Sequence, residues 1–208
     1  TDDPEIIRYA STGGMGDNMR AVGQDALAQL LDADVRTNAR IANCTYLTER
    51  LQGIPALTTP YVRPGYKHVF HYYTCLWDPE ESGVSRDTFV KALNAEGLYA
   101  VAYVKDSNYH FTPISKPVNA GDGPLHLRAV FQERNLYGKG CPFRCPHVAN
   151  PPVYAKGDLP VSEALCEREF SIGQPDLSPP CDERDMARIV EVFEKVIDHL
   201  DALREYRP

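Results

Sequence analysis

The sequence predicts an α+β domain, in which one long helix is followed by a small antiparallel or mixed sheet flanked by further helices. Three observations lead to this prediction. Apolar residues recur at helical spacing over residues 22–51 and again over residues 182–203, whereas residues 66–77 alternate as a β-strand does. With 208 residues, the chain is long enough to build one sizeable core.

The composition argues against several classes of protein. Hydrophobic residues make up 43% and charged residues 25% of the chain, which is ordinary for a globular protein. The formal net charge of -7 argues against a nucleic-acid partner. No apolar run is long enough to span a bilayer and no signal-peptide pattern opens the chain, so no membrane partner is expected. Six scattered cysteines indicate reduced thiols and predict a cytoplasmic location.

The long helix is expected to begin near Val22 and to end near Leu51, where Gly53 and Pro55 stop it. A helix of that extent would be about 45 Å long. Such a helix usually crosses between two parts of a structure or lines a dimer interface. Its expected apolar face consists of Leu27, Leu30, Leu31, Val35, Ala39, Ala42 and Tyr46.

Residues 66–77 are expected to form a central strand covered on both sides, since both faces are largely apolar. On this strand His68 and His71 would point to opposite faces, so they could not bind the same metal. Ser85 is expected to cap a helix that Gly97 ends. Residues 98–104 would then form a second strand.

The C-terminal part begins with a predicted long loop over residues 105–158, which are rich in Pro, Gly and Asn. Asp158 and Pro160 are expected to start a short helix over residues 161–169, followed by a short strand at 170–172. Asp182 is expected to cap the last helix. Its apolar stripe consists of Met186, Ile189, Val190, Phe193, Val196, Ile197, Leu200 and Leu203.

The segment before the long helix has the chemistry of an anion site. Residues 16–20 (Gly-Asp-Asn-Met-Arg) place an acid, an amide and a guanidinium just before a helix start, and Gly13 and Gly14 allow a sharp turn into it. Unpaired backbone N–H groups and the positive end of the helix dipole favour a phosphate there. From this chemistry alone, a solvated loop with an ordinary helix cap remains the alternative interpretation.

The anion segment is the first of four motifs that follow one another along the chain. They are residues 16–20, the segment Gln29-Leu30-Leu31-Asp32 followed by Arg36 and Asn38-Ala39, residues 157–163 (Gly-Asp-Leu-Pro-Val-Ser-Glu), and the last helix. In this order they resemble the DegT/DnrJ/EryC1/StrS family of sugar and cyclitol aminotransferases, which use pyridoxal phosphate (PLP). The resemblance extends over about residues 1–205.

The resemblance implies that the chain is the C-terminal half of a fold type I PLP enzyme. Residues 1–52 would be the end of the large domain, with the phosphate loop and the connecting helix, and residues 53–208 would be the small α+β domain. The parent enzyme would transfer an amino group to a keto-sugar or keto-cyclitol. It would act as a homodimer with the active site at the interface and a sugar-nucleotide or cyclitol substrate.

The resemblance also implies roles for single residues. Asn18 would hydrogen-bond the PLP phosphate of the partner subunit, Gly16 would belong to the same cofactor loop, and Arg20 would bring positive charge near the phosphate or the substrate. His126 lies in a segment that resembles a substrate-side loop, so it would contact the substrate. Tyr109 is the second substrate candidate, although residues 103–110 depart from the family pattern and do not identify the substrate.

No catalytic residue is expected in this chain. The lysines are Lys67, Lys91, Lys105, Lys116, Lys139, Lys156 and Lys195. None lies in the family's Schiff-base context, so that lysine is expected upstream of Thr1 and the chain alone is expected to be inactive. Two alternatives stay open: a dehydratase of the same family, in which a histidine replaces the lysine, or a non-catalytic dimerisation or binding module if the chain is complete.

One short segment contains three soft metal donors. They are Cys141, Cys145 and His147. A zinc site would need a fourth ligand, for which Cys166, Cys181 and His110 are candidates. Structural zinc sites usually contain two clear ligand pairs, so two free thiols in a proline-braced loop is the preferred interpretation. No metal is therefore predicted.

Overall fold

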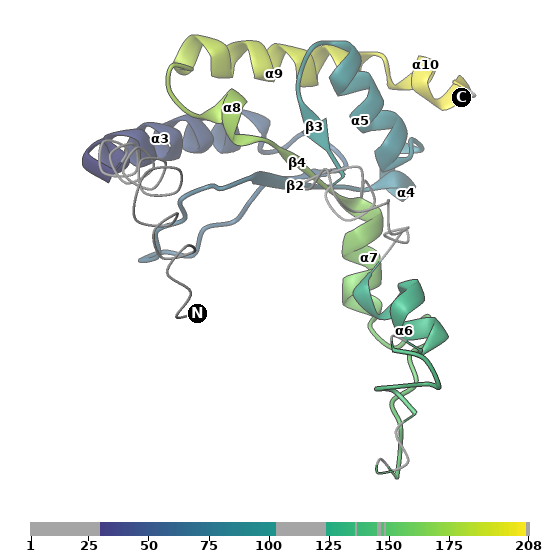
Figure 1. Cartoon of the computed structure of the whole chain (residues 1–208). Helices are drawn as coiled ribbons and strands as arrows, with labels where there is room; N and C mark the ends of the chain where they lie inside the picture. Colours follow the sequence, from purple (N-terminus) through teal and green to yellow (C-terminus); the bar gives the residue numbers. More distant parts are fainter. Residues whose placement is uncertain (1–29, 103–123, 136, 145–146, 148, 207–208) are drawn as a thin grey trace, which may run out of the picture.

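The computed structural model describes residues 30–102, 124–135, 137–144, 147 and 149–206 (Figure 1). These residues form an α+β domain with a small antiparallel sheet, as predicted. None of the helices in this part of the chain is long and apolar enough to cross a membrane. The elements are α3 (Ala33–Leu51), β1 (Leu57–Thr58), β2 (Tyr73–Trp77), α4 (Pro79–Ser82), α5 (Arg86–Ala95), β3 (Ala100–Val101), η1 (Leu125–Leu127), α6 (Ala129–Glu133), α7 (Pro160–Arg168), β4 (Glu169–Ile172), α8 (Gln174–Leu177), α9 (Glu183–Asp198) and α10 (Leu200–Glu205).

The sheet has the strand order β1-β2-β4-β3, and each neighbouring pair is antiparallel. Tyr73 of β2 pairs with Ile172 of β4, and Ala100 of β3 pairs with Ile172 from the other side. The predicted succession of a strand, a helix and a strand is confirmed as β2, α5 and β3. The last strand in the chain, β4, separates these two strands in the sheet.

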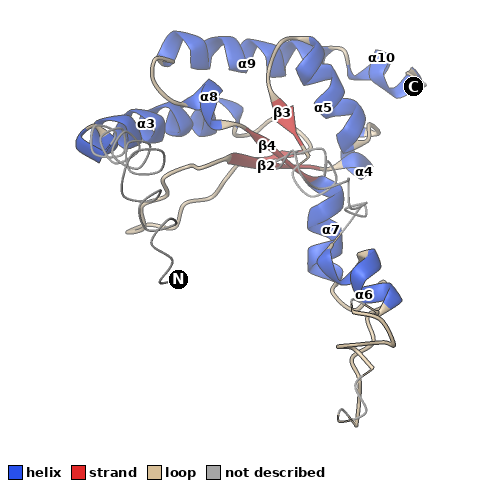
Figure 2. Ribbon diagram, in the orientation of Figure 1, coloured by secondary structure: helices blue, strands red, loops and turns tan. Residues whose placement is uncertain are grey.

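Aromatic rings join the sheet to the helices that cover it. Trp77 stacks on Phe89 of α5, with ring centroids 3.8 Å apart and planes inclined by 4°. Phe170 of β4 and Phe193 of α9 lie 5.7 and 6.1 Å from the Phe89 ring. All four rings are completely buried, and such rings contribute strongly to a core. Accordingly, α5 and α9 lie on the same side of the strands in Figure 2.

The predicted long helix is wrong in its buried face, whereas its expected start near Val22 lies outside the described residues. α3 begins at Ala33 after a turn at Asp32, and residues 1–29 lie outside the described part of the chain. Its C-terminal half packs on α8 and α9, and its buried residues are Asn43, Cys44, Leu47 and Leu51. Four members of the predicted stripe are instead exposed, namely Leu30, Leu31, Val35 and Ala42. The expected end is confirmed, since α3 ends at Leu51 and Gly53 follows with a φ of +93°.

The predicted strand over residues 66–77 is too long. β2 begins only at Tyr73, because Phe70 has a left-handed backbone conformation (φ +48°) that a strand does not adopt. His68 and His71 therefore lie before the strand and not on its two faces. Within β2 the alternation is confirmed, because Tyr73, Cys75 and Trp77 are buried. Thr74 on the other face is exposed, so the prediction that both faces of the strand are covered is wrong for the described residues.

The helix caps follow the sequence closely at α5 and α9. Ser85 accepts a hydrogen bond from the Thr88 backbone N–H and caps α5, and Gly97 follows its end with a φ of +92°. Asp182 caps α9 in a reciprocal capping box with Asp185. The apolar stripe of the last helix is also confirmed, although α9 ends at Asp198 and the stripe continues in α10. Its buried members are Met186, Ile189, Val190, Phe193 and Val196.

The arm, which we define as residues 124–168, corrects the prediction of a long loop. The segment expected to be irregular contains the helices η1 and α6. The arm ends with α7, which leads directly into β4. The arm extends away from the sheet on the side opposite α9 (Figure 1). α7 has no buried residue. Polar contacts within the arm, described below, therefore contribute much of its local order.

Candidate functional site

A pocket of about 360 Å³ lies where the arm meets α5. Pro79, Pro124 and Leu127 form its apolar wall. A concave site with apolar walls and a few polar groups is the usual form of a small-ligand site. The polar and charged residues that line it are Ser85, Arg86, Asp87, Lys156, Glu163, Cys166 and Glu167.

Arg86 fixes a positive charge at the wall of this pocket. It follows the Ser85 cap of α5 and is only 3% exposed. Its Nε donates to the Asp87 carboxylate at 2.7 Å, and its Nη1 donates to the backbone carbonyl of Glu169 in β4. A buried guanidinium needs such partners, because an unpaired buried charge is strongly unfavourable. Arg86 thereby ties the start of α5 to the central strand.

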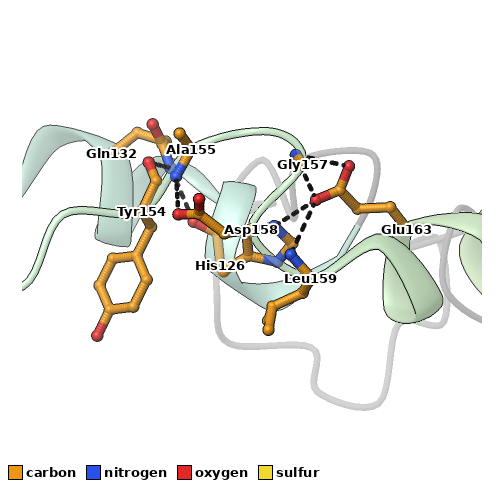
Figure 3. A network of polar contacts seen from close by, with 8 residues as sticks. All are labelled: His126, Gln132, Tyr154, Ala155, Gly157, Asp158, Leu159 and Glu163. Carbon is orange, nitrogen blue, oxygen red and sulfur yellow. Dashed lines mark hydrogen bonds and ion pairs between the residues drawn. The ribbon is translucent and has the colours of Figure 1, made fainter.

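Glu163 is the centre of a polar network in the arm (Figure 3). Its carboxylate accepts hydrogen bonds from the backbone N–H groups of Gly157, at 2.8 and 3.0 Å, and of Leu159, at 3.4 Å. The third partner is Nε2 of His126, which lies 3.0 Å from Oε1. These donors, above all the Gly157 N–H, hold the pKa of Glu163 below its ordinary value, so the side chain is charged at neutral pH.

Two further side chains shape the loop between α6 and α7. Gln132 donates from Nε2 to the backbone carbonyls of His126, at 2.7 Å, and of Tyr154, at 3.1 Å. Asp158 accepts from the Ala155 backbone N–H at 2.8 Å. It therefore does not cap α7 as predicted. Leu159 is the N-cap residue of α7 and has no side-chain cap, and Glu163 accepts from the backbone N–H of Leu159.

The loop holds Lys156 between two anchored backbone groups, those of Ala155 and Gly157. Lys156 and Glu167 both line the pocket, and neither side chain has a hydrogen bond or ion pair to another residue that the structure describes. By contrast, Arg86 is paired with Asp87, and Glu163 is surrounded by donors. Among the described residues that line it, the pocket therefore offers one uncompensated cation and one uncompensated anion.

His126, the predicted substrate contact, lies beside this pocket but not as a free side chain. It is 5% exposed and turned toward Glu163, whereas its Nδ1 is buried with no partner among the described residues. Its role as a substrate contact stays a prediction. The other predicted site residues lie outside the described residues, namely Gly16, Asn18, Arg20 and Tyr109.

Sequence reasoning missed Arg86, Lys156 and Glu163 as site residues. Glu163 ends the motif of residues 157–163, but its partner His126 lies 37 positions away in the chain. Arg86 was hidden because a charged residue after a helix cap is normally exposed. For His126 and Glu163, the available signal was that a histidine and a glutamate occur in two separate segments that resemble family motifs.

The cysteine segment gives no sign of a metal centre in the described residues. Cys141 is exposed, and Cys145 lies outside the described part. Groups of three or more His, Cys, Asp or Glu side chains that could hold a metal ion do not occur among the residues that were placed. Burial raises the pKa of the Cys166 thiol, which lines the pocket, so this thiol is a weaker nucleophile than an ordinary cysteine.

The chain matches the model of one known protein family. The model of the DegT/DnrJ/EryC1/StrS aminotransferase family matches residues 9–121, which is more than half of the chain. The chain belongs to this family. The match includes the predicted anion segment at residues 16–20, the whole of α3 and the strands β1, β2 and β3.

Relatives of this DegT/DnrJ/EryC1/StrS chain share its fold at low identity. An uncharacterized protein of Methanocaldococcus jannaschii is 23% identical over 193 residues, which are 93% of this chain and 39% of that protein. DesV of S. venezuelae, solved in complex with a ketimine intermediate, has a TM-score of 0.55 and 16% identity over 82% of this chain. DesI, solved with its TDP-sugar product, has a TM-score of 0.55 and 17% identity over 86% of this chain. The chain spans 34% and 35% of these two structures.

Aminotransferases of this family depend on PLP in general. The pocket beside the arm does not suit the PLP phosphate, because Asp87, Glu163 and Glu167 outnumber the two cations that line it. The residues predicted to bind the phosphate lie outside the described part of the chain. No step of a PLP reaction is therefore assigned to this pocket.

Proposed function

We propose that this chain is the C-terminal part of a PLP-dependent aminotransferase that transfers an amino group to a keto-sugar or keto-cyclitol. The observation that carries the proposal is the family match, which begins at residue 9 and so includes the segment Gly16–Arg20. The TDP-sugar product of DesI supports a sugar-nucleotide as the substrate class. The chain spans only about a third of each relative, which supports a part of a longer enzyme.

In this proposal the chain combines two parts of a fold type I enzyme. Residues 1–52 complete the large domain and carry the cofactor loop on the connecting helix. Residues 53–208 form the small domain, which corresponds to the α+β unit built around the antiparallel sheet. Leu30, Leu31 and Val35 lie near one another in the chain and are all exposed, which supports the assignment of that helix to an interface. Neighbouring exposed apolar side chains often mark an interaction surface, whereas single scattered ones do not.

The cofactor loop binds the phosphate group of PLP across the interface of a homodimer. Asn18 donates from its side-chain amide, Gly16 contributes a backbone N–H, and Arg20 supplies positive charge, as a dianion at a helix start requires. PLP itself supplies the electron sink for amino-group transfer. The lysine that bonds to PLP comes from a part of the enzyme upstream of Thr1.

The test compares Asn18→Ala with the wild type in the full-length protein. We expect Asn18→Ala to lose bound PLP on dialysis at least tenfold faster, because one charge-assisted hydrogen bond to the phosphate is removed. PLP absorbance after dialysis measures the effect. Asn38→Ala is the matched control, since Asn38 lies exposed on α3 and contacts only Lys67 in the described structure. Equal PLP retention by wild type and Asn18→Ala would contradict the assignment of this loop.

The reaction itself is tested with a TDP-keto-sugar and L-glutamate or L-glutamine. Formation of an amino-sugar product supports the proposal. A dehydrated sugar without amino-group transfer would instead indicate the dehydratase activity, and absence of PLP uptake by a folded full-length protein would indicate a binding module. Light scattering of the same sample decides whether the protein is the expected homodimer.

A further inference from the structure

The pocket between α5 and the arm has a charge pattern that the proposed aminotransferase function does not use. Its two uncompensated charges have opposite signs, Lys156 and Glu167. Arg86 adds a fixed, nearly buried positive charge on the same wall. We propose that this pocket binds a free α-amino acid, with its carboxylate toward Lys156 and Arg86 and its ammonium toward Glu167.

The charges favour a zwitterion over a ligand of one sign. An anion alone would meet Lys156 but would also face the carboxylates of Glu163 and Glu167. A cation alone would meet Glu167 but would face Lys156 and Arg86. A ligand with both charges compensates each side chain, and charge-assisted hydrogen bonds of this kind are stronger than neutral ones.

The size and the walls of the pocket fit such a ligand. A volume of about 360 Å³ lies near the lower end of small-ligand pockets, which range from roughly 300 to 1,000 Å³. Pro79, Pro124 and Leu127 give an apolar surface for the Cα and an aliphatic side chain. The pocket therefore suits a small amino acid better than a nucleotide sugar.

The arm presents Lys156 in advance of binding. The backbone on either side of Lys156 is held by Asp158 and by Glu163, and Glu163 is held in turn by His126. A loop that is already ordered loses less conformational entropy when the ligand binds. In this arrangement Lys156 and Glu167 contact the ligand, whereas Glu163 and His126 are positioning residues.

This inference goes beyond the proposed function, because it concerns non-covalent binding that needs no PLP. The experiment is calorimetric titration of the full-length protein, freed of PLP, with glycine and with L-alanine. Glycinamide lacks the carboxylate, acetate lacks the ammonium, and myo-inositol lacks both. We expect glycine and L-alanine to bind, and each of the other three compounds to bind at least tenfold more weakly.

Two pairs of variants make the test specific. Lys156→Met and Glu167→Gln are each expected to weaken amino-acid binding at least tenfold. Their matched controls are Lys195→Met and Glu191→Gln on α9, which do not line the pocket and are expected to bind as the wild type does. Both pocket side chains are exposed, so the variants are expected to keep the wild-type circular dichroism and melting temperature.

The results separate this inference from the proposed function. Equal binding of glycine and glycinamide, equal binding by wild type and Lys156→Met, or no binding of either amino acid would overturn the inference. Tight binding of myo-inositol alone would also overturn it, in favour of a polyol site. PLP uptake, read from absorbance in a separate sample, tests the aminotransferase proposal, and amino-acid binding by a protein that takes up no PLP would support only the pocket.

Discussion

Nε2 of His126 lies 3.0 Å from Oε1 of Glu163, although the two residues are 37 positions apart in the chain. The contact joins η1 to α7, and both side chains are largely shielded from solvent. Because α7 buries no residue of its own, this contact and the two N–H donors beside it hold the base of the arm together. The base of the arm is therefore held by polar contacts, in addition to the packing of Phe131 on Phe143 and Tyr154 farther along it.

The first prediction concerns Glu163→Gln. Replacing the carboxylate with an amide weakens the acceptance of hydrogen bonds from Gly157 and Leu159. We expect hydrogen exchange at these two amides to become about tenfold faster. Glu167→Gln is the matched control, because Glu167 lies on the same helix without a hydrogen bond to another described residue. Unchanged exchange at Gly157 would refute the role of Glu163.

The same contact predicts a dependence on pH. The pKa of Glu163 in the folded chain lies below its ordinary value of 4.5, mainly because the Gly157 N–H stabilises the charged form. The stabilisation is therefore complete above about pH 4.5 and is lost as the pH falls through the lower pKa of the folded state. After correction for intrinsic rates, protection of Gly157 should fall at low pH in the wild type. Glu163→Gln should show no such fall, and an equal fall in both proteins would speak against the mechanism.

The second prediction concerns Asn43, a buried amide between α3 and the segment before α9. Its Nδ2 donates to the backbone carbonyls of Leu177, at 3.0 Å, and Cys181, at 3.1 Å. Asn43→Ala leaves both carbonyls without this donor, so we expect the free energy of unfolding to fall by about 2–3 kcal/mol. Urea denaturation measures the change. The exposed Asn38→Ala should change stability by less than about 0.5 kcal/mol, and equal effects of the two variants would contradict the assignment.

The third prediction concerns the single tryptophan. Trp77 is completely buried, stacks on Phe89, and donates from Nε1 to the Val84 carbonyl at 2.9 Å. We expect its fluorescence to lie at short wavelength in the native protein and to shift to longer wavelength on unfolding. Phe89→Leu removes the stacked ring and should lower the free energy of unfolding by about 1–3 kcal/mol. Phe143→Leu, in the arm, should leave the native emission of Trp77 unchanged.

The fourth prediction concerns thiol reactivity. Burial raises the pKa of Cys44 to about 12, and burial together with Cys44 raises the pKa of Cys75, so neither thiol forms a thiolate in the native protein at neutral pH. Cys141 is exposed. Peptide mapping after brief iodoacetamide treatment should find Cys141 modified, and Cys44 and Cys75 only after unfolding. Labelling of native Cys44 at the rate of Cys141 would show that the α3 packing opens readily.

The elements that sequence predicted correctly are those specified by local chemistry. Ser85 and Asp182 mark helix starts because their side chains accept the unpaired N–H groups of the first turn. The stripe of α9 is clear because its buried apolar residues recur at helical spacing. The errors arose where local pattern and packing differ. Nothing in the apolar run before β2 announces the left-handed backbone at Phe70, and the spacing of Leu30, Leu31 and Val35 does not show which face of α3 will be covered.

By itself, the sequence determined the family, the α+β class, the caps of α5 and α9 and the alternation of Tyr73, Cys75 and Trp77, because each depends on residues close together in the chain or on motifs in a fixed order. Only the tertiary structure decided that β4 lies between β2 and β3, that Arg86 is buried against β4, and that His126 meets Glu163. Each of these depends on contacts between segments far apart in the chain. Such contacts are selected by the burial and pairing of whole elements, which no short stretch of sequence records.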